Sequence, residues 1–142
     1  MRQLLSAGDY EAVVEFYEGL QRQAEESVVQ QARQQLLGHA RELLESQRYP
    51  SAETLLQRLL VAAWRDVEVR VLLAELGYRQ GDMNAAIEQL YEARGHAWDP
   101  VTLARLDYGL FLALRRMGTS KERICSALCL SYAEYDYIDA ME

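Results

Sequence analysis

Apolar residues recur every three or four positions from about residue 10 to residue 130, which is the spacing of one face of an α-helix. The chain is rich in Leu, Ala, Glu, Gln and Arg, whose side chains lose little conformational freedom in a helix. Only two prolines and eight glycines interrupt the 142 residues, too few turn residues for a fold of many short strands. The pattern therefore predicts an all-α protein.

Residues that favour helix ends divide this pattern into segments. The signals predict about seven helices of roughly 12–18 residues, joined by turns of about two to four residues. Connections this short place successive helices antiparallel. The predicted helix starts are the aspartates Asp9, Asp66, Asp82 and Asp99, the last followed by Pro100, and a further start at Pro50. Two capping boxes are also predicted, one at Ser27 with Gln30 and one at Thr119 with Glu122. The predicted helix ends are Gly95 and Gly118.

The charge balance excludes several kinds of partner. The net charge is −7, and Lys121 is the only lysine. An acidic chain does not attract phosphate backbones or anionic lipids, so neither nucleic acid nor a membrane surface is an expected partner. The chain also has no apolar run of about 20 residues, so no direct membrane insertion is expected. The first residues lack the apolar run of a signal peptide. We therefore expect one cytoplasmic domain over residues 1–142.

Three segments open in a similar way and suggest an internal repeat. They are residues 8–15, 47–56 and 81–88, and Tyr49 and Met83 stand 34 positions apart. A unit of two helices cannot bury its apolar face alone and must stack on a neighbour. Three positions of the two units agree at this offset: Ala40 with Ala74, Ala52 with Ala86, and Leu56 with Leu90. Residues 67–100 also carry Leu73, the turn Gly81-Asp82, Ala93, and Trp98 to Pro100, whereas residues 34–66 carry Tyr49 and have Gln47-Arg48 in place of the Gly-Asp turn.

The period and these residues resemble the tetratricopeptide repeat family. The resemblance implies a right-handed α-solenoid of three to four antiparallel helix pairs, whose first helices line a concave groove. It also implies a protein-interaction module that binds a peptide or helix of a partner protein in that groove. Carried over to this chain, the groove-facing residues are Gln34, Leu37, Arg41, Glu68, Val71, Glu75, Tyr78 and Arg79; Leu103, Leu106 and Leu110 belong to the less regular last pair. The chaperone-binding type of this family uses lysines and asparagines in the groove. The only lysine and asparagine of this chain, Lys121 and Asn84, are not on the groove-lining helices, so this type of binding is not expected.

No pattern in the sequence indicates catalysis, a cofactor or a metal. His39 and His96 have no acidic or cysteine partner at metal spacing and are interpreted as structural histidines. Cys125 and Cys129 are four residues apart, which would place both thiols on one helix face as small core residues. We therefore expect a binding or scaffold role and no enzyme activity.

The acidic, tyrosine-rich tail at residues 132–142 allows two interpretations. Ile138 and Met141 could make it a short amphipathic helix that docks on the last pair and caps the stack. Alternatively, its three tyrosines and four acidic residues could bind arginines of a neighbouring molecule.

Two alternative roles stay open. Residues 90–106 resemble helical accessory domains of some bacterial membrane-anchored aspartic proteases, which would make the chain part of a longer, periplasmic protein. A solenoid with an uncapped end also exposes apolar surface, so self-association, for example as a homodimer, is the second alternative.

Overall fold

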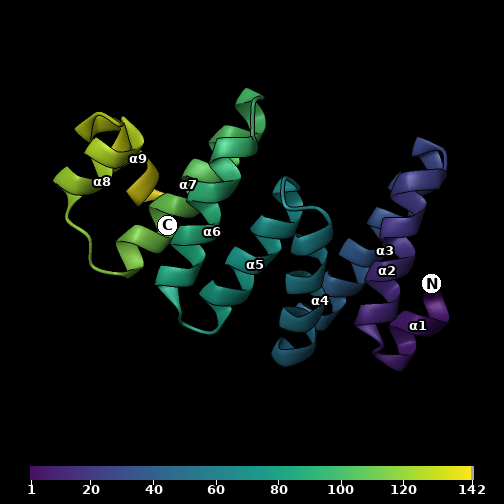
Figure 1. Ribbon diagram of the computed structural model, residues 1–142. Coiled ribbons are helices and arrows are strands. Elements are labelled where there is room, and N and C mark those ends of the chain that lie inside the picture. Colours follow the sequence, from purple (N-terminus) through teal and green to yellow (C-terminus); the bar gives the residue numbers. More distant parts are fainter. Residues whose placement is uncertain (142) are drawn as a thin grey trace.

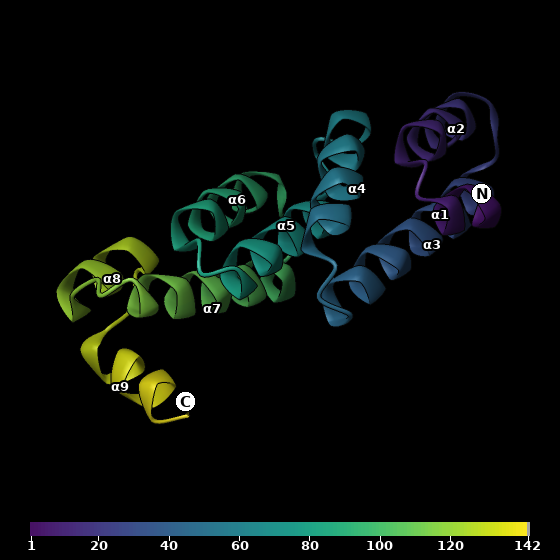
Figure 2. The same ribbon diagram turned by 90° about the horizontal axis from the view of Figure 1, so that it is seen from below.

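The computed structural model describes residues 1–141, and these form nine α-helices and no strand. The predicted all-α class is therefore confirmed. Figures 1 and 2 show the helices following one another along the molecule, with the termini toward opposite ends. The helices are α1 (Arg2–Ala7), α2 (Tyr10–Gln23), α3 (Glu26–Glu45), α4 (Tyr49–Ala62), α5 (Val67–Arg79), α6 (Met83–His96), α7 (Pro100–Arg116), α8 (Lys121–Leu128) and α9 (Tyr132–Ala140).

The molecule exposes more surface than a closed globule of its mass. Its accessible surface is 8483 Å², whereas a compact monomer of 16.3 kDa exposes about 7,500 Å². The difference agrees with an extended row of helices.

Four helices begin at aspartates that the sequence marks as starts. Asp9, Asp82 and Asp99 accept hydrogen bonds from backbone N–H groups three residues later, at 3.2, 3.1 and 2.9 Å. Asp66 accepts from the N–H of Glu68 at 3.0 Å. These caps satisfy donors that the first turn of a helix leaves without an intrahelical partner.

Both predicted capping boxes are wrong. The chain becomes extended at Ala24, and α3 starts at Glu26 after Glu25, which makes no side-chain cap bond. Ser27 therefore already lies inside the helix. The N–H of Thr119 donates to the carbonyl of Leu114 at 3.0 Å and closes α7. The cap of α8 consequently falls to Ser120.

Two further helix ends differ from expectation. The helix α6 continues through Gly95 to His96 and ends where Ala97 becomes extended, so Gly95 does not close it. A capping box does occur at Ser131 and Glu134, where both reciprocal hydrogen bonds form. This box starts α9, one of two helices, with α1, beyond the expected seven.

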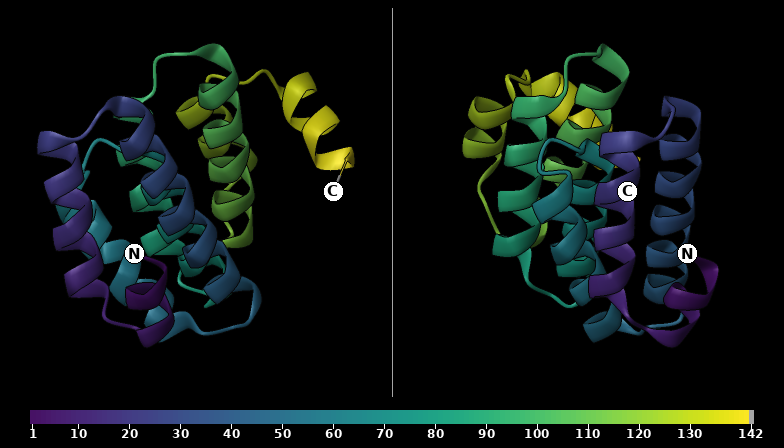
Figure 3. Two further views of the ribbon diagram at one scale, coloured as in Figure 1. Left: turned by 90° about the vertical axis from the view of Figure 1, so that its right-hand side faces the viewer. Right: turned by 45° about the vertical axis from the view of Figure 1, so that its right-hand side comes forward.

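The tail forms the helix α9, which projects from the side of the row (Figure 3). The rings of Phe111 and Tyr135 lie 5.1 Å apart, and Ile138 also packs against the core. Asp136 pairs with Lys121 at 2.7 Å and Asp139 with Arg115 at 2.9 Å. The helix therefore packs against α7 and α8, which confirms the expected docking on the last pair, although Met141 is exposed and Glu142 lies outside the described residues.

Buried apolar residues form two clusters that meet at α5. The first extends from α1 to α5 and includes Val69, Leu72 and Leu76. The second extends from α5 to α8 and includes Ala74, with Val71 packed against it. The helix α5 is therefore buried on two sides and links the two halves of the molecule.

Close packing at Gly77 holds α5 against α6. A methyl group at this position would lie 3.0 Å from the carbonyl oxygen of Asp82 and 3.1 Å from the backbone nitrogen of Ala86. Both atoms belong to the backbone, which cannot move aside without separating the two helices.

We predict that Gly77→Ala destabilises the protein by about 1–3 kcal/mol, because overpacking outweighs the better helix propensity of alanine. Gly19→Ala is the matched control, because Gly19 lies in α2 with no atom near its Cβ position, and it should stabilise by up to about 1 kcal/mol. Urea unfolding measures both changes. Equal effects of the two substitutions would contradict the close approach.

An ion pair fixes α3 to the start of α5. Arg33 donates from Nε to Asp66 Oδ2 at 2.7 Å and from Nη2 to Oδ1 at 2.9 Å. The two side chains are only 22% and 11% exposed. The hydrogen bond to Asp66 raises the pKa of Arg33. Burial is the main cause of the raised pKa of the adjacent Tyr17, with a further contribution from the charge of Asp66.

We expect Asp66→Asn to lower the free energy of unfolding by about 2 kcal/mol, because the amide keeps the cap but leaves Arg33 without a counter-charge. The control is Asp82→Asn at an exposed cap without an ion pair, for which a change below about 0.5 kcal/mol is expected. Thermal and urea unfolding would test this, and a neutral Asp66→Asn would show that the pair adds nothing.

Candidate functional site

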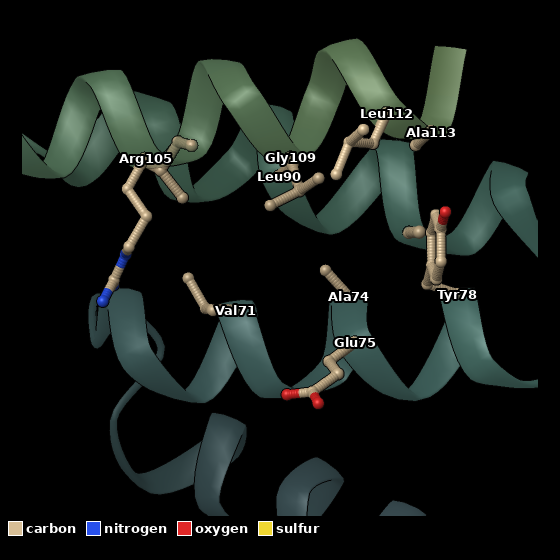
Figure 4. A pocket seen from close by; sticks show the side chains of 11 residues that line it. Val71, Ala74, Glu75, Tyr78, Leu90, Arg105, Gly109, Leu112 and Ala113 are labelled. Atoms are coloured by element: carbon tan, nitrogen blue, oxygen red, sulfur yellow. The ribbon is translucent and has the colours of Figure 1, made fainter. Parts of the chain in front are cut away.

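An apolar cleft lies between α5 and α7, and α6 lies behind it and lines it with Ala86 and Leu90 (Figure 4). Its volume is about 190 Å³. Figure 4 shows Val71 and Ala74 pointing from α5 toward the side of α7 that carries Leu112, with Leu90 of α6 between them. The lining residues are Val71, Ala74, Glu75, Tyr78, Ala86, Leu90, Arg105, Leu106, Gly109, Leu112 and Ala113.

One side of α7 forms a wall of this cleft. Arg105, Gly109, Leu112 and Arg116 follow one another at spacings of four, three and four residues, so they share one face of the helix. Gly109 has no side chain, and a methyl group there would lie 3.3 Å from Cδ1 of Leu90. The glycine thus lets Leu90 form the floor between the two arginines.

The opposite wall comes from α5, where Val71, Ala74, Glu75 and Tyr78 have helical spacing. Ala74 is short and leaves the middle of the cleft open, whereas Tyr78 places a ring at one end. On the other side of α5, Leu72 and Leu76 pack in the first core cluster, which extends from α1 to α5. The position of the wall is therefore fixed by packing on the far side of α5.

Charged residues form the two ends of the cleft. At one end Glu68 of α5 pairs with Arg105 of α7 and, at 3.8 Å, with Arg41 of α3. At the other end the guanidinium of Arg116 lies 4.7 Å from the centre of the Tyr78 ring, a cation–π arrangement. An apolar trough between charged ends is a shape that can hold an amphipathic segment.

Arg79 stands beside the cleft and joins α3 to α5. It pairs with Glu75 at 2.8 Å and with Glu45 at 3.2 Å, and it donates to the carbonyl of Leu44 at 3.3 Å. The hydrogen bond to Glu75 is the largest cause of the raised pKa of Arg79.

The structure brings most of the groove residues expected from the sequence together. Val71, Glu75 and Tyr78 line the cleft. Beside it, Arg41 forms an ion pair with Glu68, and Arg79 forms ion pairs with Glu75 and Glu45. Gln34 is exposed on α3 and does not line the cleft. The prediction that Leu37 faces the groove is wrong, because its side chain is 1% exposed and belongs to the core that α3 shares with its neighbours.

Sequence reasoning missed Arg105, Gly109, Leu112 and Arg116. Of the three α7 leucines considered, Leu106 lines the cleft, whereas Leu110 is fully buried and Leu103 is half-buried. The repeated spacing of two arginines around a glycine and a leucine was the available signal.

The histidines and cysteines lie away from this cleft. Nε2 of His39 is 3.5 Å from the hydroxyl of Tyr10, and the ring of His96 meets Trp64 edge-on at 5.2 Å. Cys125 is buried, but Cys129 is exposed at the end of α8 with φ 56°. The two thiols therefore do not share a buried face, which corrects that expectation. Within residues 1–141, no three His, Cys, Asp or Glu side chains are grouped to hold a metal ion.

Comparison of the chain with protein-family models, curated proteins and solved structures finds no match. Within the described part of the chain, none of the helices combines the length and apolar character that crossing a membrane requires.

Proposed function

We propose that the chain is a tetratricopeptide-like protein-interaction module that binds a peptide or helix of a partner protein in the cleft between α5 and α7. The observation that carries the proposal is the apolar cleft itself, about 190 Å³ in volume and bounded by charged residues at both ends. Ligand sites are concave and mainly apolar, with a few placed polar groups that fix orientation.

The proposed architecture is a right-handed solenoid of antiparallel pairs, α1 with α2, α3 with α4, α5 with α6 and α7 with α8, closed by α9. The short turns between these helices support antiparallel pairing. The contacts of α5 with α3, α4 and α6, and of α7 with α6 and α8, support stacking in chain order.

Solution scattering would test this shape. A compact domain of this length has a radius of gyration of about 14.5 Å. We expect a larger radius and an asymmetric distance distribution for the row of helices. A radius at the compact value would reject the solenoid.

Photo-crosslinking in the source cell would test the binding role. We expect a benzoyl-phenylalanine in place of Tyr78 to capture a partner protein, and the same residue in place of Tyr137, 70% exposed on α9, to leave it uncaptured. Adding Val71→Arg should reduce capture by more than about tenfold, because it puts a charge on the apolar wall.

Val61→Arg is the matched control, because Val61 is 81% exposed on α4 and outside this cleft. Circular dichroism and urea unfolding establish that both variants are folded. Equal capture by the Val71→Arg and Val61→Arg proteins would remove the cleft as the binding site.

Self-association is a second candidate, favoured by large apolar side chains exposed in the α4–α5 connection, in the α6–α7 connection and in the first turn of α7. Trp98 and Val101 are 88% and 79% exposed, and Trp64 is 52% exposed. Light scattering over a range of concentrations tests this candidate, and a monomer at every concentration would eliminate it.

A further inference from the structure

We propose, on the basis of the binding role above, that the cleft between α5 and α7 binds an acidic amphipathic helix of a partner protein, with a carboxylate at each end held by Arg105 and Arg116. Three features of the cleft select this occupant: the lack of backbone partners, the charge at its ends and the spacing of the two arginines.

The walls favour a helix over an extended segment. Of the lining residues, only Glu75, Tyr78 and Arg105 carry polar side chains, and Arg105 is engaged with Glu68. An extended peptide pressed into this cleft would leave its backbone N–H and C=O groups without partners, which is costly. A helix satisfies those groups internally and presents only side chains to the wall.

The charge around the cleft has the opposite sign to that of the whole chain. The arginines there are Arg41, Arg79, Arg105 and Arg116, and the carboxylates are Glu45, Glu68 and Glu75. Four positive and three negative charges leave a local charge of +1, whereas the chain carries −7. Physiological salt screens charges beyond about 8 Å, so a bound segment experiences these nearby groups more strongly than the distant acidic residues of the chain.

Two of these arginines have unused hydrogen-bonding capacity. Arg105 shares the single carboxylate of Glu68 with Arg41, and its side chain is 51% exposed. Arg116 forms no ion pair with a described residue and lies on the Tyr78 ring. A guanidinium offers five N–H donors in a planar fork that suits a carboxylate.

The spacing of the arginines sets the length of the bound helix. Arg105 and Arg116 are eleven residues apart on one face of α7, which corresponds to about 16 Å along the helix axis. A partner helix lying along α7 matches this distance with acidic residues about three turns apart. Its apolar residues then fall between them, at the positions that face Val71 and Leu112.

Selection from a display library of random peptides of about 16 residues would test the inference, since three turns plus flanks fit that length. The full chain is the target, and peptides that also bind the Val71→Arg protein are removed. We expect the remaining sequences to carry apolar residues at helical spacing and an excess of Asp and Glu at both ends. A synthetic peptide of the selected type should become helical on binding.

Arg116→Glu should weaken that synthetic peptide at least about tenfold, because each end relies on a charge-assisted pair. Arg123→Glu is the matched control, since Arg123 is exposed on α8, has no ion pair among the described residues and is outside the cleft. Exchanging the acidic residues of the peptide for lysine should abolish binding to the native chain and restore part of it to the Arg116→Glu protein.

The possible failures are distinguishable. Cleft-dependent peptides that are neutral, basic or extended overturn the acidic helix but leave the proposed function standing. A selection in which no peptide depends on Val71 overturns both. A dimer of the native chain that Val71→Arg dissociates in light scattering assigns the cleft to a second copy and overturns the inference.

Discussion

The two-sided burial of α5 determines how the rest of the chain is arranged. A helix with apolar residues on one stripe can rest on a single core, whereas one with apolar residues on two sides must be covered twice. Leu72 and Leu76 of α5 face one cluster, and Ala74 faces the other. The helices before and after α5 therefore pack on opposite sides of it, and the molecule grows as a row with a large exposed surface.

The helix α5 also carries a buried cation, Arg70. Arg70 on α5 is 9% exposed and donates from Nε to the carbonyl of Trp64 and from Nη1 to Oε1 of Gln89, each at 3.1 Å. Its partners are the connection before α5 and the helix after it. A buried polar group without such partners would cost stability, so these bonds fix the orientation of α5 relative to both neighbours.

The local signals in the sequence predict the helices better than the cleft. Asp9, Asp82 and Asp99 act as caps wherever the sequence places them, because a short acidic side chain needs only its own first turn. Ser27 fails because α2 ends earlier, with Ala24 extended, so that α3 has already begun at Glu26. Thr119 fails because its N–H still belongs to the end of α7, where it donates to the carbonyl of Leu114. The cleft depends on how α5 and α7 are rotated about α6, and no local pattern reports that rotation. The spacing of Arg105 and Arg116 places them on one face of α7 from the sequence alone. That this face lies opposite α5 and forms a cleft could not be predicted from the spacing.

The two seams beside α5 have different contents, and this difference is why we propose a binding role for only one of them. Where α3 and α5 meet, Leu36, Leu37 and Val69 fill the space together with Tyr17 of α2 and Leu59 of α4. The pair of Arg33 with Asp66 also lines this space, of which about 10 Å³ is left. Between α5 and α7, the short side chains of Ala74 and Gly109 leave about 190 Å³ with apolar walls. A space of 10 Å³ scarcely admits one water, whereas an open apolar cleft keeps its walls in contact with solvent. Covering these walls releases that water, and the arginines at the two ends supply the polarity that a purely apolar surface would lack.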